Sequence, residues 1–130
     1  MNNYRLTGVR GATTANENNS EAIFDATVEL VTNLVELNQI KEEDIVHVIF
    51  TVSPDITADF PAKGARLGLK WDKVPMICAQ EIAVSLNIKY CIRVLIATYS
   101  SLPRDQIKHI YLREASKLRP DLNYNQYADI

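Results

Sequence analysis

The strongest constraint on the fold is the apolar run YCIRVLIAT at residues 90–98. Its β-branched and apolar side chains favour a strand, and they occupy both odd and even positions, as in a strand that is covered on both faces. Only Arg93 interrupts the run. A buried guanidinium is costly unless it is paired with a carboxylate or faces an anion. Arg93 therefore predicts either a structural ion pair, for which Glu81 is the candidate partner, or a binding site for a charged ligand.

A strand and a long helix are predicted before this run. Residues 4–13 alternate as a strand does, and Gly8 and Gly11 within them indicate a bulge or a close approach of another backbone. Residues 21–38 carry apolar side chains three to four positions apart, which is typical of an amphipathic helix. Asn38 is suited to close that helix.

The remaining elements follow from the same kinds of pattern. In order, they are a strand at 45–53, a short helix at 61–68, a short strand within 71–81 that ends near Cys78, the strand at 90–98, a turn at 100–106 and a strand at 107–112. In the first of these strands Val46, Val48, Phe50 and Val52 are expected to share one face, because strand side chains alternate.

This order predicts an α/β or α+β fold with a single mixed β-sheet, one long helix and one or two short helices. A chain of 130 residues has about the length of one domain, so residues 1–130 are expected to form a single unit. The tail at 120–130 either covers a cleft or stays flexible. So few helices cannot cover both faces of the sheet. The open face is therefore expected to pack on other copies of the chain, as in a homo-oligomer.

Charge and composition exclude several classes of function. The chain has 14 Lys and Arg against 16 Asp and Glu, so it lacks the basic excess of nucleic-acid-binding domains. No apolar run reaches transmembrane length and the first residues are polar, so neither a membrane span nor a signal peptide is expected. Cys78 and Cys91 do not form a C-x-x-C pair, which favours free thiols in a reducing cytoplasm. His47 and His109 are far apart in sequence, so no metal site is predicted.

Several polar residues have an ordinary structural interpretation when each is considered alone. Lys63 and Arg66 are three positions apart, which fits the solvated face of the short helix. Tyr111 fits a core aromatic residue with a satisfied hydroxyl. Cys78 fits a small buried apolar residue, and His109 fits a structural histidine.

Considered together, these residues point to anion binding. Nothing marks a nucleophile with its base, and the phosphate-binding pattern G-x-x-x-x-G-K-[ST] is absent. What remains is a set of arginines, a tyrosine and a glutamate in mostly apolar surroundings. Arginine is suited to bind carboxylates through two parallel hydrogen bonds. The sequence therefore predicts a small anionic ligand that carries carboxylate groups.

Six short motifs also resemble one known family in order and spacing. They are VRGATT at 9–14, FPAK..R at 60–66, P..C.QE at 75–81, CIRV at 91–94, H.YL at 109–112 and LRPDL at 118–122. The chain resembles the monofunctional chorismate mutases of the AroH class from about Arg5 to Leu122, which is nearly its whole length.

This resemblance implies a homotrimeric pseudo-α/β-barrel with the sheets inside and the helices outside. Three active sites would lie in clefts between neighbouring subunits. The implied reaction is the Claisen rearrangement of chorismate to prephenate, on the route to phenylalanine and tyrosine. It needs no cofactor and no metal.

The resemblance also implies a role for particular residues. Arg93 would stand beside the ether oxygen, and Glu81 near the ring hydroxyl. Arg10 and Tyr111 would contact substrate carboxylates, and Arg10, Glu81 and Arg93 form the expected catalytic set. Further residues of the implied binding site are Phe60, Lys63, Arg66, Ile77, Cys78, Leu118 and Arg119.

Two positions depart from the family pattern. Ile77 stands where a small polar residue is expected, which would change the wall of the pocket. Gly64 stands where alanine is usual, which is expected to loosen the short helix by up to about 1 kcal/mol. Two other functions remain as alternatives: an imine deaminase of the YjgF-like type, whose arginine motif is not found in this sequence, and a metabolite-binding protein without catalysis.

Overall fold

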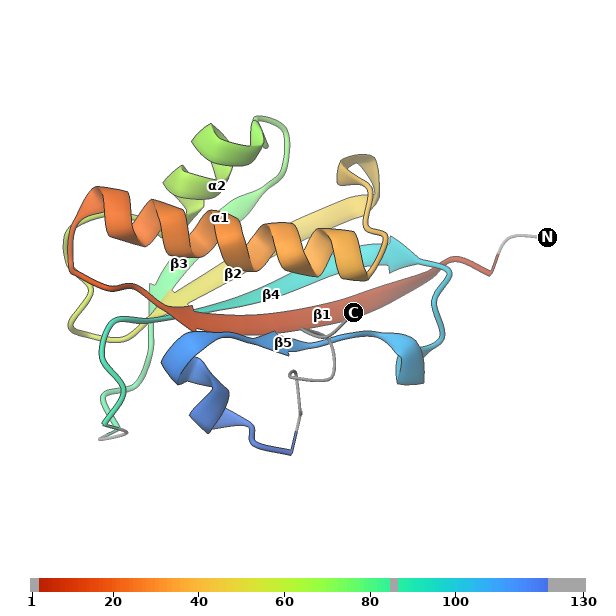
Figure 1. Cartoon of the computed structure of the whole chain (residues 1–130). Coiled ribbons are helices and arrows are strands. Elements are labelled where there is room, and N and C mark those ends of the chain that lie inside the picture. The colour runs from red at the N-terminus through yellow and green to blue at the C-terminus, as the bar shows by residue number, and fades with distance from the viewer. Residues whose placement is uncertain (1–2, 85–86, 122–130) are drawn as a thin grey trace.

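The computed structural model describes residues 3–84 and 87–121. Its main elements are β1 (Arg5–Thr14), α1 (Ser20–Leu37), β2 (Ile45–Val52), α2 (Pro61–Leu69), β3 (Met76–Gln80), β4 (Cys91–Ser100) and β5 (Ile110–Tyr111). Three 3-10 helices are interspersed, namely η1 (Glu42–Asp44), η2 (Arg104–Gln106) and η3 (Arg113–Leu118). The predicted order of strands and helices is confirmed, as is the mixed sheet with one long and one short α-helix (Figure 1).

The strand at the centre of the sheet is the apolar run of the sequence. The five strands lie in the order β3-β2-β4-β1-β5. β4 pairs antiparallel with β1 on one side and with β2 on the other, while β3 and β5 pair parallel with β2 and β1. In this register Arg93 lies between Ala12 and Thr51. Because both neighbours hold its main chain, the position of Arg93 is fixed by the sheet and not by a loop.

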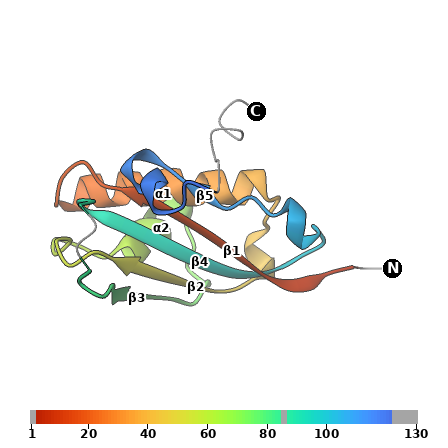
Figure 2. The same ribbon diagram turned by 90° about the horizontal axis from the view of Figure 1, so that it is seen from below.

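The helix α1 covers one face of the sheet. Its Ile23, Leu30 and Leu34 are fully buried and share one core with strand residues such as Phe50 and Ile96. Burying each such side chain contributes about 1.5–3 kcal/mol. Figure 1 shows α1 lying across the sheet with α2 beside it, and Figure 2 shows both helices on the same side of the strands.

The opposite face of the sheet carries exposed apolar side chains. Leu6 and Tyr99 are cross-strand partners and are 60% and 47% exposed. Ile49 lies between Leu95, which is 45% exposed, and Ile77, which is 63% exposed. Among the described residues, neither α1 nor α2 lies over this face (Figure 2). The 3-10 helix η3 covers only one end of it, where Ala115 packs against Ala12 and Cys91. The expected open face is therefore present in the single chain.

Glycines allow two close approaches between elements. A Cβ on Gly11 would lie 2.7 Å from the Ile110 carbonyl oxygen, so the predicted close approach of another backbone is confirmed there. A Cβ on Gly64 would lie 2.8 Å from Phe24 Cδ1 and 3.0 Å from Phe24 Cα. The glycine of α2 thus lets that helix pack directly on α1, a role that the sequence did not indicate. A Cβ on Gly8, by contrast, would make only an ordinary contact, at 3.7 Å from Leu95 Cδ1.

One prediction about which side chains of β2 share a face of the sheet is wrong. Val46 was expected to share the buried face with Val48, but it is 39% exposed while Ile45 is buried. The register shifts between Ile45 and His47, which is the mark of a β-bulge. A bulge adds one residue to one strand and reverses the facing of the residues before it.

The last predicted strand is much shorter than residues 107–112, because only Ile110–Tyr111 forms β5. Side chains satisfy the main chain just before it. Asn38 Oδ1 accepts from the N–H of Lys108 at 2.7 Å and Asn38 Nδ2 donates to its carbonyl at 2.9 Å. His109 uses its ring to bind β1. The expected tail lies mostly outside the described residues, which end at Asp121.

Candidate active site

Four of the predicted site residues line one cavity on the open face of the sheet. This strand-face cavity is lined by Arg10 from β1, Glu81 after β3, Arg93 from β4 and Tyr111 from β5, with Thr51 of β2 among the other lining residues. Strands that are far apart in sequence bring these side chains together because β4 and β1 are neighbours in the sheet. The grouping of arginines, a tyrosine and a glutamate that the sequence predicted is present here.

An ion pair joins two of these residues. Arg93 Nη1 lies 3.6 Å from Glu81 Oε1, so the expected partner of Arg93 is confirmed. The main chain holds Glu81 at this place, since its N–H donates to the Val52 carbonyl at 2.8 Å. The two side chains are 41% and 33% exposed, and such pairs contribute little to stability. The guanidinium is therefore positioned by Glu81 without being bound tightly to it.

Two residues that line the same cavity carry buried polar atoms without a partner among the described residues. Arg10 Nε and Thr51 Oγ1 are buried and have no hydrogen-bond partner among the described residues. A buried donor left without a partner costs on the order of 1–3 kcal/mol, so such atoms are uncommon and usually have a function. A ligand with acceptor oxygens would satisfy the Arg10 donor.

The wall of the cavity near β5 is tightly packed. Tyr111 is 1% exposed and belongs to a small apolar cluster against which Leu118 packs. The next residue, Arg119, donates to both carboxylate oxygens of Asp121, from Nε at 2.9 Å and from Nη2 at 2.7 Å. This hydrogen bonding lowers the pKa of the exposed Asp121 carboxyl. Leu118 therefore packs on the Tyr111 side of the cavity, and Arg119 follows it in the chain.

A second cavity holds five of the other predicted residues. This α2–β3 cavity is lined by Phe60, Lys63, Arg66, Ile77 and Cys78. Phe60 and Ile77 are 64% and 63% exposed, so this cavity presents large apolar side chains to solvent. Burial raises the pKa of the Cys78 thiol above its usual value, so this thiol stays protonated near neutral pH.

Asp59, which the sequence did not single out, contacts two residues that line this second cavity, Phe60 and Lys63. Asp59 accepts from Ser20 Oγ at 2.7 Å and from the N–H of Phe60 at 2.8 Å. Its carboxylate lies 3.9 Å from Lys63 Nζ. The hydrogen bond from Ser20, followed by that from Phe60, lowers the pKa of the Asp59 carboxyl. Asp59 therefore carries the negative charge that faces Lys63.

The two cavities have no lining residue in common. The rows of the sheet explain their separation, because Thr51 lies between Arg93 on β4 and Ala79 on β3. Neighbouring strands are about 4.8 Å apart, so Arg93 on β4 lies two strand spacings from Ala79 on β3. Within one chain, the predicted binding residues therefore form two groups and not one site.

The sequence pattern indicates the roles of Thr51 and His109 only in part. Thr51 lies in register with Arg93, but its orphaned hydroxyl depends on the folded packing. His109 had been expected to be structural, and its Nδ1 accepts from the main-chain N–H of Arg10 at 3.2 Å. Within residues 3–84 and 87–121, no group of three or more His, Cys, Asp or Glu side chains is placed to hold a metal ion.

Comparison with known structures places this fold among the chorismate mutases. The structure of a chorismate mutase from Clostridium thermocellum matches with a TM-score of 0.82 and 36% sequence identity, covering 85% of this chain and 98% of that one. The sequence model of the family described as chorismate mutase type I matches residues 6–122. The chain belongs to this family.

Curated relatives agree with this assignment. Chorismate mutase AroH from Bacillus subtilis strain 168 is 38% identical over 125 residues, which is 96% of this chain and 98% of that protein. Chorismate mutase AroH from Thermus thermophilus is 44% identical over 121 residues, or 92% of this chain and 98% of that protein. Both matches span almost the entire length of the relative.

Proposed function

We propose that this chain is a chorismate mutase, an isomerase that converts chorismate to prephenate in the biosynthesis of phenylalanine and tyrosine. Membership of the family supports this assignment. The observation that carries it in the structure is that Arg93 lines the same cavity as Arg10, whose buried Nε has no partner among the described residues. Guanidinium groups of this kind suit a substrate with two carboxylates.

The chemistry asks little of the protein beyond position and charge. The rearrangement is unimolecular and pericyclic, so it needs neither a nucleophile nor a proton relay. The site must hold the compact diaxial conformer of the dianion, which is an effect of orientation. It must also stabilise the negative charge that develops on the ether oxygen as the C–O bond breaks before the C–C bond is complete.

Arg93 is the residue that we assign to the ether oxygen. Its main chain lies in the central strand and its side chain is held by Glu81 at 3.6 Å. A fixed guanidinium gains most when negative charge appears next to it, and it needs no reorganisation at that moment. Glu81 is assigned to the ring hydroxyl, where its carboxylate would accept a hydrogen bond while it keeps the guanidinium in place.

Arg10 and Tyr111 are assigned to the substrate carboxylates. Arg10 offers a buried donor that has no partner among the described residues. Its main chain is fixed by His109, and Tyr111 lies in the neighbouring strand. Leu118 and Arg119 would close the cavity on that side.

We further propose that the complete active site lies between subunits of a homotrimer. Two observations support this assembly. The binding residues fall into two cavities within one chain, so a neighbouring copy would have to supply Phe60, Lys63, Arg66, Ile77 and Cys78. In addition, exposed apolar side chains such as Leu95 and Ile77 lie on the open sheet face. Burying them against another copy would remove that surface from water.

The cellular setting and the extent of the domain are part of the same proposal. No helix among the described residues is long and apolar enough to span a membrane. The Cys78 and Cys91 thiols are free, which supports a cytoplasmic enzyme. Residues 1–130 would form one catalytic domain without cofactor or metal.

The direct test is to incubate the purified chain with chorismate and to follow both substrate loss and prephenate formation. We expect turnover without added metal or cofactor, and a native mass of three chains. Chorismate binding without turnover near neutral pH would indicate a metabolite-binding protein instead. Release of ammonia from an imine-forming amino-acid system would indicate the deaminase alternative.

A further inference from the structure

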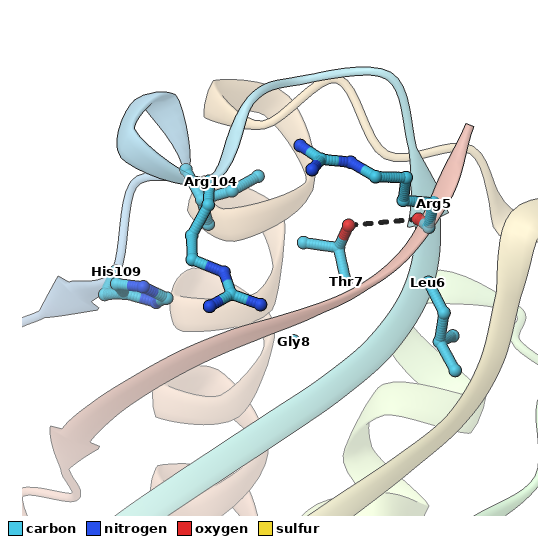
Figure 3. Close-up of a pocket in the computed structure, with 7 residues that line it drawn as sticks. Arg5, Leu6, Thr7, Gly8, Arg104 and His109 are labelled. Atoms are coloured by element: carbon cyan, nitrogen blue, oxygen red, sulfur yellow. Dashed lines mark hydrogen bonds between the residues drawn. The ribbon is translucent and has the colours of Figure 1, made fainter. Parts of the chain in front are cut away.

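A third pocket lies away from both cavities, at the outer edge of β1. It is lined by Arg5, Leu6, Thr7 and Gly8 of β1, by Arg104 of η2, and by Ile107 and His109 before β5. Figure 3 shows the Arg104 guanidinium reaching toward β1 near Gly8, with His109 on one side and Thr7 on the other. The side chain of Arg5 extends over the same side of the strand. No residue of the active-site cavities takes part.

The charges in this pocket are unbalanced. Arg5 and Arg104 both line it and no carboxylate does. Among the described residues neither arginine forms an ion pair, whereas Arg93, Arg113 and Arg119 each have a carboxylate partner. Two guanidinium groups that share a pocket repel each other, and an anion between them would remove this repulsion.

The main chain of β1 adds further donors. In a strand the N–H groups point alternately to the two sides. The N–H of Arg10 points away from β4 to the His109 ring, so those of Leu6 and Gly8 point to the same outer side. The pairing with β5 covers only Gly11 and Ala12, which leaves the earlier N–H groups facing the pocket.

We propose that this β1-edge pocket is a second binding site for a small oxyanion, either a phosphate or the carboxylate of a metabolite. Guanidinium groups together with outward-facing main-chain N–H groups are the donors that such anions prefer. The site does not depend on the proposed catalytic function. It is separate from the substrate cavity, which lies on the open face of the sheet.

The site is linked to the active site through one histidine. His109 lines the β1-edge pocket, and its Nδ1 accepts from the N–H of Arg10 at 3.2 Å. Arg10 in turn lines the strand-face cavity. An anion in the pocket therefore changes the surroundings of His109, and the Arg10 N–H reports this change.

The test is a titration followed by amide NMR of the intact protein, with inorganic phosphate in one series and succinate in another, at constant ionic strength. We expect saturable shifts of the Leu6, Gly8 and Arg10 amides. Arg5→Gln and Arg104→Gln should each weaken binding by about fivefold or more, as expected for loss of one charged donor. The matched control Lys41→Gln removes an exposed charge elsewhere and should leave the affinity within about twofold.

The outcomes separate the possibilities. Tighter binding of phosphate would identify a phosphate site, and tighter binding of succinate a carboxylate site. Because succinate also resembles the substrate, the amides of Thr51 and Arg93 are followed as reporters of the active site. The proposal fails if the shifts rise linearly without saturation. It also fails if they are confined to Thr51 and Arg93, or if both arginine variants bind as the wild type does.

Discussion

Arg93 combines a rigid main chain with a guanidinium that one carboxylate positions but does not saturate. It lies in the central strand of the sheet, and its side chain has one carboxylate nearby at 3.6 Å. That distance is too long for a strong hydrogen bond, so the guanidinium keeps its capacity to donate to a ligand. A residue that only stabilised the fold would be expected to make closer and more numerous contacts.

We expect Arg93→Lys to lower kcat strongly. Lysine keeps the charge, but it loses the planar fork and the second donor that a developing oxyanion uses. By analogy with the removal of one oxyanion donor, the loss of transition-state stabilisation should be about 2.7–4 kcal/mol. Steady-state kinetics on chorismate measure this loss. A change in kcat of less than about tenfold in a folded protein would exclude the assigned role.

His109 provides a pH-dependent contribution to stability. Burial, followed by the charges of Arg10 and Arg119, lowers the pKa of this imidazole below its usual 6.5. The unfolded chain therefore takes up the proton at a higher pH than the folded chain does. Between the folded pKa and 6.5 the unfolded state binds more protons, so the stability falls as the pH falls through this window.

We expect His109→Asn to reduce this dependence. Asparagine keeps a carbonyl acceptor for the Arg10 N–H but does not titrate. Urea unfolding from about pH 7.5 to about pH 5.5 should show a smaller loss of unfolding free energy in the variant than in the wild type. Equal slopes for the two proteins would mean that His109 is protonated equally in the folded and unfolded states.

At the scale of elements, the contact between α1 and α2 places the second cavity. α2 begins at Pro61, which suits a first helical position, and it ends at Leu69, where Lys70 follows in the left-handed conformation. Between these ends, Gly64 allows the helix to lie against Phe24 of α1. This packing fixes the direction in which Lys63 and Arg66 project into the α2–β3 cavity.

We expect Gly64→Ala to destabilise the protein despite the higher helix propensity of alanine. The propensity gain is up to about 1 kcal/mol, whereas overpacking costs about 1–3 kcal/mol. The added methyl group would lie 3.0 Å from a main-chain atom of Phe24, which cannot move freely. Urea denaturation measures the net change. The same substitution in a Phe24→Leu background should cost less, and a variant more stable than the wild type would show that α2 shifts without penalty.

The elements also show why some features follow from the sequence and others do not. Alternation and helical spacing predict α1 and β4 because each depends on residues that are near in sequence. The short length of β5 depends instead on Asn38, whose amide binds both main-chain groups of Lys108. The bulge at Val46 depends on pairing with β4. Interactions between distant segments of this kind leave no local pattern.

At the scale of the whole molecule, the candidate site was predictable only in part. The residue types alone indicated guanidinium groups for an anion, and the family motifs supplied the particular residues. The division of these residues between two cavities is not visible in sequence, because Cys78 and Glu81 are only three positions apart and yet line different cavities. β3 lies at the edge of the sheet and its side chains point alternately to the two faces, so Cys78 and Glu81 reach different cavities. This division has a direct consequence for assembly.

A mixing experiment tests whether one active site draws on two chains. Arg93→Ala removes a group of the strand-face cavity, and the double variant Lys63→Ala/Arg66→Ala removes two groups of the α2–β3 cavity. Each protein alone should be nearly inactive. If the site forms between chains of a closed ring, equal mixing and co-refolding should restore about a quarter of the wild-type activity per site, because a site is intact when one variant supplies each half. If both halves came from the same chain, no mixed site would be complete and the activity would stay at the level of the separate variants.

Two preparations of the same variant, refolded together, provide the control for refolding itself. Recovery that grows with the fraction of mixed trimers in the native mass spectrum would establish the shared site.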